Sequence, residues 1–282
     1  MANILNALIE LVANNTYIVS GRTTTHGGSV MNALGDNLED YVVDLFAGTL
    51  NETDKNERDN KINSIFSYIG NSTNPPDAML KGGDAIEVKK IKGDSQLQLN
   101  SSYPKHKLYK NDTHICDRCR TCETWEEKDM LYVVGIVPDD KKIKSLFFTY
   151  GLTYAAENEV YDNIVKQMKK GIEEIDGPVF AETKELGRVN QIDLLKRTNL
   201  RLRGMYLMEN PWNAYGMQAI ERDKEIVVYA LIPTTKYNSF DNVQMFEDFC
   251  DTIGTMTIRD VEVPDPTYPN KTIECKKITF YK

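Results

Sequence analysis

Two strand-like segments on either side of a glycine turn constrain the fold of this chain more than any other feature. In the first segment, 75–80, two consecutive prolines exclude a helix before Asp77 and favour an extended backbone. Residues 81–84 read Lys-Gly-Gly-Asp, which is typical of a tight turn because glycine readily adopts positive φ. Polar and apolar residues then alternate, so Glu87 and Lys89 point to the same face of a second strand. The sequence therefore predicts a hairpin that brings Asp77 beside Glu87.

The polar side chains of this hairpin, Asp77, Glu87 and Lys89, suit the hydrolysis of phosphodiester bonds. Two hard carboxylates can hold Mg²⁺, which supplies charge to a phosphate and lowers the pKa of a bound water. Lys89 would orient that water or stabilise the charge that develops on the phosphate. Pro76-Asp77 followed by Glu87-Val88-Lys89 resembles the PD-(D/E)xK motif of nucleases. The alternative interpretation is an ordinary amphipathic hairpin with a solvated charged face.

The composition of the chain narrows the class of protein. It has 282 residues, 41% hydrophobic and 27% charged, which is typical of a globular protein of one large or two small domains. The net charge is −8 and the pI about 5.1, which argues against a histone-like or polybasic binder. A basic groove within an acidic exterior is compatible with these values, and would confine nucleic acid to the groove.

The chain shows no sign of export or of a membrane span. Its first ten residues have no basic region and include Glu10, unlike a signal peptide, and no apolar run approaches the length of a transmembrane helix. The five cysteines, three of them clustered, do not resemble a disulfide framework. We therefore expect a cytoplasmic protein that does not contact the membrane.

The spacing of apolar residues predicts helices packed on a mixed sheet. Helical spacing is found near 4–12, 34–47, 62–69, 157–175 and 240–249. Strands are expected near 130–137, 143–150, 200–203, 225–233, 255–263 and 272–281. The segment 130–137 is almost wholly apolar, as expected of a central strand that is covered on both faces.

Glu39 lies one residue away from the apolar stripe of the second predicted helix. It is either a solvated glutamate or a further acid at the edge of the metal site, because the helix that precedes the hairpin of PD-(D/E)xK nucleases often supplies one.

Two regions have side chains that suit contact with DNA. The polar and basic segment after the hairpin, 92–108, contributes Asn100, Ser101, Ser102, Lys105 and Lys107. Further along, Arg201 and Arg203 lie on one face of a strand, and Arg188 and Asn190 precede them. The arginines and Asn190 are candidates for base edges, and the two lysines for phosphates. The alternatives are a surface loop and surface salt bridges.

A cluster of cysteines follows the polar segment, and comprises His114, Cys116, Cys119 and Cys122. Cys-x-x-Cys spacing suits a tetrahedral Zn²⁺, but the middle cysteine is shared between two such pairs. The fourth ligand would be His114, Cys250 or Cys275. Two interpretations remain open, namely a structural zinc that staples this insert and free thiols in a reducing compartment.

With these features in place, the chain resembles type II restriction endonucleases of the NgoPII type. The resemblance rests on 76–77 with 87–90, then 99–105, 125–137 and 185–205. It implies an α/β fold with a restriction-endonuclease-like core, Mg²⁺-dependent cleavage of double-stranded DNA, a homodimer and a short GC-rich palindromic target of the GGCC kind.

Carried over residue by residue, the resemblance implies that Asp77 and Glu87 bind the metal and that Lys89 serves the nucleophile. We expect one nuclease domain over 1–282, with a Cys-rich insert near 112–124 and a DNA-contacting region near 185–212. The alternatives are a DNA-binding or scaffold protein without catalysis, and a repair or junction nuclease of the same fold.

Overall fold

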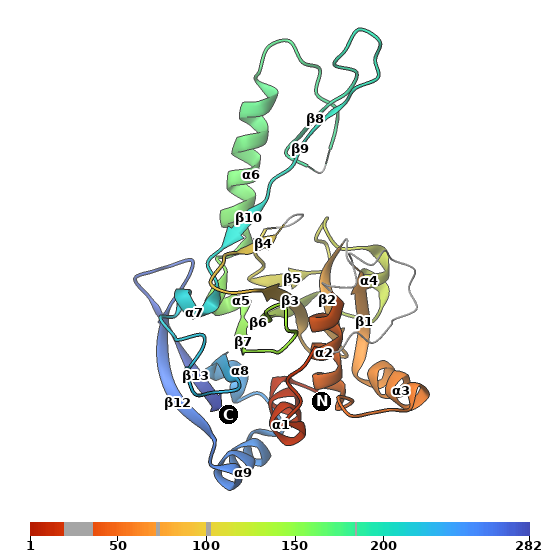
Figure 1. Ribbon diagram of the computed structural model, residues 1–282. Helices are drawn as coiled ribbons and strands as arrows, with labels where there is room; N and C mark the ends of the chain where they lie inside the picture. The colour runs from red at the N-terminus through yellow and green to blue at the C-terminus, as the bar shows by residue number, and fades with distance from the viewer. Residues whose placement is uncertain (20–35, 72–73, 100–102, 184) are drawn as a thin grey trace.

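The computed structural model describes residues 1–19, 36–71, 74–99, 103–183 and 185–282 (Figure 1). Its helices are α1 (Ile4–Asn14), α2 (Asp36–Ala47), α3 (Lys55–Ile65), α4 (Asp117–Thr121), α5 (Gly151–Tyr154), α6 (Asn158–Glu173), α7 (Pro211–Ala214), α8 (Thr234–Tyr237) and α9 (Val243–Ile253). The first strands are β1 (Phe66–Asn71), β2 (Asn74–Leu80), β3 (Ala85–Ile91), β4 (Leu97–Leu99), β5 (Lys107–Tyr109), β6 (Glu127–Ile136) and β7 (Ser145–Tyr150). The remaining strands are β8 (Gly187–Val189), β9 (Leu200–Leu202), β10 (Tyr206–Met208), β11 (Val227–Pro233), β12 (Met256–Pro264) and β13 (Thr272–Tyr281).

The predicted hairpin is present as β2 and β3. The two strands pair antiparallel through Ala78 with Ile86 and Met79 with Ala85. Gly82 in the turn has φ of 63°, a backbone conformation that favours glycine. The turn chemistry read from the sequence therefore sets the register of this hairpin.

The hairpin is part of a large mixed sheet. In the part of the chain that the structure describes, the strand order is β1-β2-β3-β6-β7-β11-β13-β12, and β5 pairs with β6. The pairs β3–β6 and β7–β11 are parallel, and the other pairs along this order are antiparallel. This arrangement confirms the expected mixed sheet flanked by helices.

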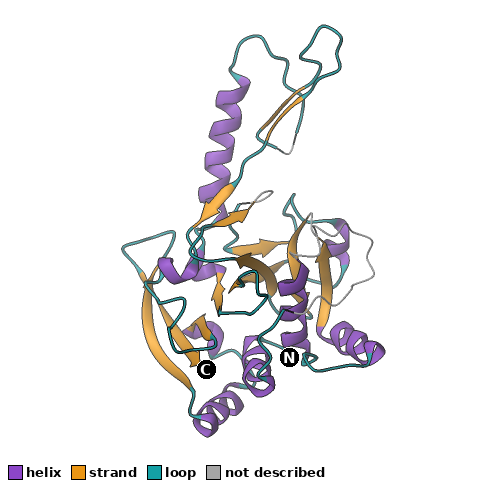
Figure 2. Cartoon of the chain, viewed as in Figure 1, coloured by secondary structure: helices purple, strands orange, loops and turns teal. Residues whose placement is uncertain are grey.

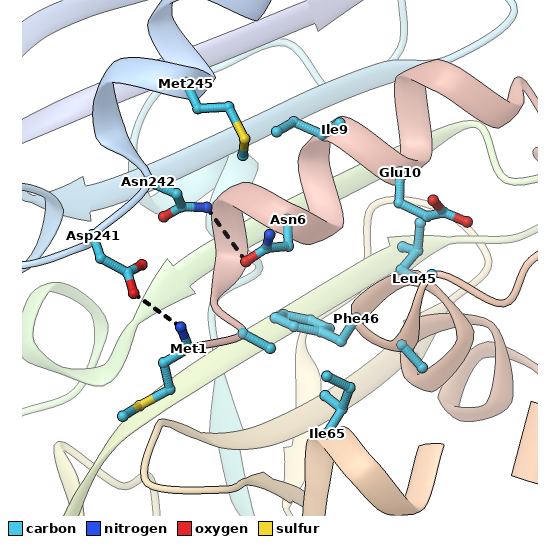
Figure 3. A pocket seen from close by; sticks show the side chains of 13 residues that line it. Met1, Asn6, Ile9, Glu10, Leu45, Phe46, Ile65, Asp241, Asn242 and Met245 are labelled. Atoms are coloured by element: carbon cyan, nitrogen blue, oxygen red, sulfur yellow. Dashed lines mark hydrogen bonds and ion pairs between the residues drawn. The ribbon is translucent and has the colours of Figure 1, made fainter. Parts of the chain in front are cut away.

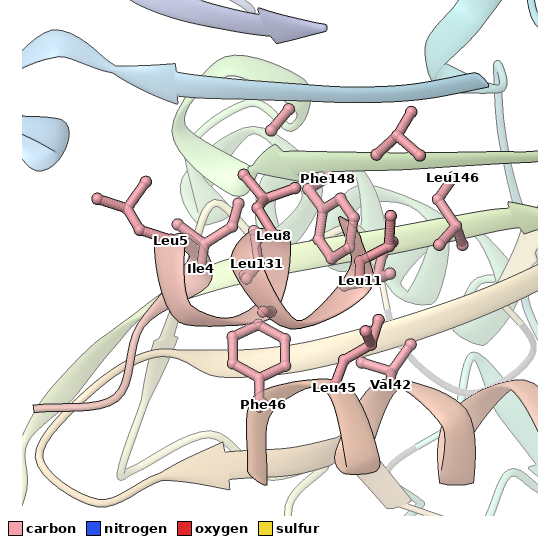
Figure 4. Close-up of a cluster of buried hydrophobic side chains, with 14 of the residues drawn as sticks. Ile4, Leu5, Leu8, Leu11, Val42, Leu45, Phe46, Leu131, Leu146 and Phe148 are labelled. Carbon is pink, nitrogen blue, oxygen red and sulfur yellow. The ribbon is translucent and has the colours of Figure 1, made fainter. Parts of the chain in front are cut away.

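The larger apolar core lies on one face of the sheet, where α1 and α2 pack on the central strands (Figure 4). Leu8 of α1 and Leu45 of α2 meet Leu131 and Phe148 of the sheet there, and all four are fully buried. The opposite face is covered in part by Trp212 of α7 and by β4 and β10. Glu87 and Lys89 project toward this second face, because Ile86 and Val88, which alternate with them, lie in the larger core.

An arm projects from this core (Figures 1 and 2). It consists of α6 and the narrow pair β8–β9, and β10 leads the chain back to the body of the protein. The helix was predicted from its apolar stripe, but the stripe does not cover the sheet. Val160, Ile164, Met168 and Ile175 are between 40% and 54% exposed. Periodicity alone identifies a helix and does not show what the helix packs against.

The helix predicted near 62–69 is partly wrong. The structure ends α3 at Ile65 and starts β1 at Phe66. The apolar side chains of Ile62, Ile65 and Ile69 pack on the edge of the larger core from two different elements. A short apolar run fits the period of a helix or that of a strand, and here the pairing of β1 with β2 makes the second half of the segment a strand.

In the described ranges, no helix is long and apolar enough to cross a membrane.

A buried ion pair fixes the start of β3. Asp84, which is 2% exposed, accepts hydrogen bonds from Lys236 Nζ at 2.6 Å and from the Tyr150 hydroxyl at 2.7 Å. Lys236 also donates to Asp129 Oδ2 at 2.7 Å. Burial raises the pKa of Asp84, and the charge of Lys236 opposes that rise. The cluster therefore connects the hairpin turn to β6, to the end of β7 and to α8.

Replacement of Lys236 by Met is expected to lower the free energy of unfolding by about 3 kcal/mol, because Asp84 would remain buried without its cation. Urea denaturation monitored by circular dichroism measures the change. Lys170→Met is the matched control, because Lys170 is 81% exposed and lies 4.0 Å from Glu174. Its expected effect is below about 0.5 kcal/mol. Equal losses in the two variants would contradict this role of Lys236.

Candidate functional site

The carboxylate of Asp77 sits where the pairing of β2 with β3 ends. The last paired residues are Ala78 and Ile86. One residue further, Asp77 Oδ2 accepts a hydrogen bond of 2.6 Å from the backbone N–H of Val88. The side chain thus takes the donor that a continued ladder would use. Asp77 is thereby held against the strand that carries Glu87.

Glu87 and Lys89 form a pair on the same strand. Lys89 Nζ donates to Glu87 Oε1 at 2.6 Å and to the carbonyl oxygen of Val88 at 3.2 Å. Glu87 is 8% exposed, and among the residues that the structure describes no donor reaches its buried Oε2. An unpartnered carboxylate oxygen in a buried position is costly, and it is a suitable ligand for a hard cation.

The charges at this point do not balance. Burial, and then the negative charge of Glu87, raise the pKa of Asp77 well above its ordinary value, while Lys89 opposes the rise. Burial disfavours the charged form of Lys89, but the carboxylates of Glu87 and Asp77 outweigh burial and raise its pKa. A divalent cation between the two carboxylates would relieve their repulsion.

Glu39 of α2 belongs to the same electrostatic neighbourhood. Its side chain is half-buried, and its charge contributes to the raised pKa of both Asp77 and Lys89. The structure therefore brings Asp77, Glu87 and Lys89 together on one strand pair, and places Glu39 near enough for its charge to act on Asp77 and Lys89. Asp77 and Glu87 are the carboxylates that could hold a hard metal ion, and among the described residues Glu39 does not complete a metal-ligating group of three with them.

The backbone of Gly70 in β1 packs closely against the backbone of Asp77, and this residue was not identified from the sequence. A Cβ at Gly70 would lie 2.5 Å from the carbonyl oxygen of Pro76 and 2.9 Å from that of Asp77. The two backbones are thus packed too closely for any side chain at this position. A glycine inside a strand is the one sequence signal that indicates such an approach.

Tyr132 anchors the polar segment that follows the hairpin. It lies beside Glu87 in the β3–β6 register, and its hydroxyl accepts from Lys105 N at 2.6 Å and donates to Lys105 O at 3.2 Å. The Lys105 side chain is 3% exposed; its ammonium pairs with Asp112 and lies 3.9 Å from the ring centre of Tyr103. This burial argues against a direct phosphate contact by Lys105.

The structure places the other described candidates for DNA contact in two regions. Lys107 is partly exposed and pairs with Glu127 at 2.6 Å, so its ammonium lies near the surface. Asn100, Ser101 and Ser102 lie outside the described residues. Arg188, Asn190, Arg201 and Arg203 lie on or beside β8–β9, on the arm and apart from Asp77.

The cysteine cluster does not converge on one point. Cys116 Sγ lies 3.3 Å from the Tyr68 hydroxyl, Cys119 Sγ contacts Met79 Sδ at 3.3 Å, and Cys122 Sγ contacts the carbonyl of Cys119. His114 Nδ1 lies 3.0 Å from Asp112 Oδ1. Within the described ranges, no three His, Cys, Asp or Glu side chains form a group suited to a metal ion. The arrangement does not support the zinc interpretation.

A pocket of about 700 Å³ lies elsewhere, between α1, α2 and the segment that enters α9 (Figure 3). Its lining includes Asn6, Phe46 and Met245, and the Met1 amino group pairs with Asp241 at its rim. None of Asp77, Glu87, Lys89 or Glu39 lines it. The two partners of that ion pair are 66% and 67% exposed, whereas Glu87 of the hairpin is buried, so we place the chemistry at the hairpin.

Comparison with known proteins gives two results. The model of the NgoPII restriction endonuclease family matches residues 2–264. The type II restriction enzyme NgoPII of Neisseria gonorrhoeae is 44% identical over 283 residues, which cover 99% of each chain. No solved structure matches the chain.

Replacement of Gly70 by Ala is expected to lower the free energy of unfolding by about 2 kcal/mol, because the new methyl group would collide with the backbone of Pro76 and Asp77. Urea denaturation checks this. Gly93→Ala is the matched control, because a Cβ there meets no atom within 4 Å. The interpretation fails if both variants are as stable as the original protein.

Mg²⁺ is expected to raise the melting temperature of the protein, and Asp77→Asn to abolish the rise. Binding at a hundred times the Kd adds about 2.7 kcal/mol, which is several degrees for a chain of this size. Asp139→Asn is the control, because Asp139 is 85% exposed in a surface ion pair.

As the pH is lowered, the Mg²⁺-induced rise in melting temperature should disappear at a pH higher than that at which an ordinary aspartate becomes protonated. Protons compete with the metal for the ionised form of Asp77, and the pKa of Asp77 is raised. Differential scanning fluorimetry across a pH series measures both effects, and an equal Mg²⁺ shift in Asp77→Asn would rule out this metal site.

Proposed function

The chain belongs to the NgoPII restriction endonuclease family, and we propose that it is a type II restriction enzyme that hydrolyses phosphodiester bonds at specific sites in double-stranded DNA. The relative named above covers almost the whole chain, which supports transfer of the activity to this protein. The observation that carries the proposal is the meeting of Asp77, Glu87 and Lys89 in one strand pair, with Glu87 Oε2 unpartnered among the described residues.

We propose Mg²⁺ as the cofactor, held by Asp77 and Glu87 with Glu39 as a further acid. When bound, the ion supplies positive charge to the scissile phosphate and lowers the pKa of a coordinated water. Asp77 is oriented for this task by the N–H of Val88. Lys89, kept cationic by its neighbours, would orient the attacking water or stabilise charge on the phosphate.

For recognition of the target we propose a homodimer that reads a short GC-rich palindrome of the GGCC kind. The specific sequence rests on the resemblance of the chain to its family. A two-fold dimer needs each chain to read only half of a palindrome. Arg188, Asn190, Arg201 and Arg203 are the candidates for base edges, and Lys107 is the candidate for phosphates. We expect the enzyme to act in the cytoplasm, where its DNA substrate would be met.

Digestion of a sequenced plasmid with the purified protein, with and without Mg²⁺, tests the proposed activity. Discrete fragments are expected only with Mg²⁺, and their ends give the target. Glu87→Gln should lower the cleavage rate at least about a hundredfold, because Glu87 is both a proposed metal ligand and the partner of Lys89, and the substitution removes its charge. Glu126→Gln is the matched control, because Glu126 is 87% exposed and should leave the rate unchanged.

Two outcomes would contradict the proposal. An intact plasmid under all conditions, with folded protein that still binds DNA, would indicate a DNA-binding protein without catalysis. Preferential cleavage of branched DNA over linear duplex would indicate a repair or junction nuclease of the same fold.

A further inference from the structure

The two-stranded ribbon β8–β9 has one apolar face and one basic face. Gly187 lies opposite Leu202 in the ribbon, and a Cβ at Gly187 would meet Leu202 and Ile172 of α6 within 3.3 Å. The next pair in the register is Arg188 with Arg201. Since side chains alternate between faces of a strand, the apolar pair packs on α6 and the two arginines project away from it.

One carboxylate organises two of the arginines on this ribbon. Glu185 Oε2 accepts from Arg201 Nε at 2.8 Å, and Oε1 accepts from Arg201 Nη2 at 2.5 Å and from Arg203 Nε at 2.8 Å. The Glu185 side chain is 19% exposed, whereas those of Arg201 and Arg203 are 55% and 60% exposed. The carboxylate thus lies beneath two guanidinium groups that face solvent.

The third arginine is held in a similar way. Arg188 Nε donates to Asn190 Oδ1 at 2.8 Å. All three guanidinium groups are therefore held through Nε, and that of Arg201 also through Nη2. A guanidinium has five N–H donors, so these contacts leave donors on the terminal nitrogens of each fork. Two donors side by side at the end of an arginine match the O6 and N7 acceptors of guanine in the major groove.

The shape of the element suits the same ligand. The major groove of B-form DNA admits a two-stranded ribbon, and β8–β9 projects from the body of the protein on the arm (Figure 1). Fixing arginine side chains before binding reduces the conformational entropy that is lost when they meet a base.

The carboxylate also distinguishes between two ligands. Arginine binds phosphate as well as guanine, but Glu185 places a negative charge beside the donors of Arg201 and Arg203. That charge repels an anionic phosphate and affects a neutral base edge much less. A cluster built to bind the DNA backbone would not need it.

We propose that β8–β9 is the base-reading ribbon of this enzyme, and that Glu185 is a positioning residue that aims Arg201 and Arg203 at guanine edges in the major groove. This inference rests on the proposed function and adds to it a reading element and a residue that governs specificity. Glu185 touches no base in this account and acts through the two arginines.

The test compares binding of two duplexes without divalent cations, so that no cleavage occurs. One duplex carries the site at which the original enzyme cuts, and the other has one G·C pair of that site replaced by A·T. Glu185→Ala should reduce the ratio of the two affinities about tenfold, because two guanidinium groups lose their orientation. Glu182→Ala removes an exposed carboxylate of the same arm and should leave the ratio unchanged.

Arg201→Lys keeps the charge but loses the fork, so it should reduce the ratio while the salt dependence of binding stays the same. Thermal unfolding shows whether Glu185→Ala perturbs the arm. If it does, Arg201→Lys alone tests the inference. Equal weakening of both duplexes by Arg201→Lys or by a folded Glu185→Ala would overturn the inference and indicate a backbone contact or a structural role. An original protein that cuts no site would instead overturn the proposed function, and this inference with it.

Discussion

The hydrogen bond from the Val88 N–H to Asp77 Oδ2 is the contact on which the candidate site depends. It holds the carboxylate of one strand against the next at the point where the ladder ends. The arrangement is unfavourable for the charged form of Asp77, because burial raises its pKa and repulsion from Glu87 raises it further. Lys89 offsets part of this cost. A site that holds unbalanced negative charge in this way is suited to a cation that arrives later.

The rest of the fold keeps that strained arrangement in place. The larger apolar core lies beneath β3, and Gly70 lets β1 press directly on the backbone of Asp77. The ion pair of Asp84 with Lys236 fixes the start of the same strand. The proposed recognition element is separate from this body, because the clustered arginines lie on the arm. The protein thus divides the chemistry and the proposed reading of DNA between two parts of one chain.

Much of the site was predictable because its signals are local. Prolines, a glycine turn and period-two alternation define the hairpin, and the register of β2 with β3 follows from them. The contacts of the cysteine side chains were not predictable, because Cys-x-x-Cys spacing does not show that Cys119 packs against Met79. The burial of Lys105 depends on a partner seven residues away, and the contacts of Glu185 depend on how β9 lies beside it. Such pairings arise from tertiary structure, which spacing in the sequence does not encode.

The measurement that tests the central claim most directly is anomalous diffraction from crystals soaked in Mn²⁺, a hard divalent substitute for Mg²⁺. The account predicts a manganese peak within coordination distance of carboxylate oxygens of both Asp77 and Glu87. It also predicts that the peak is lost in Glu87→Gln crystals grown in the same way. Manganese bound elsewhere with none at this hairpin, or a peak that persists in the variant, would contradict the assignment of the site.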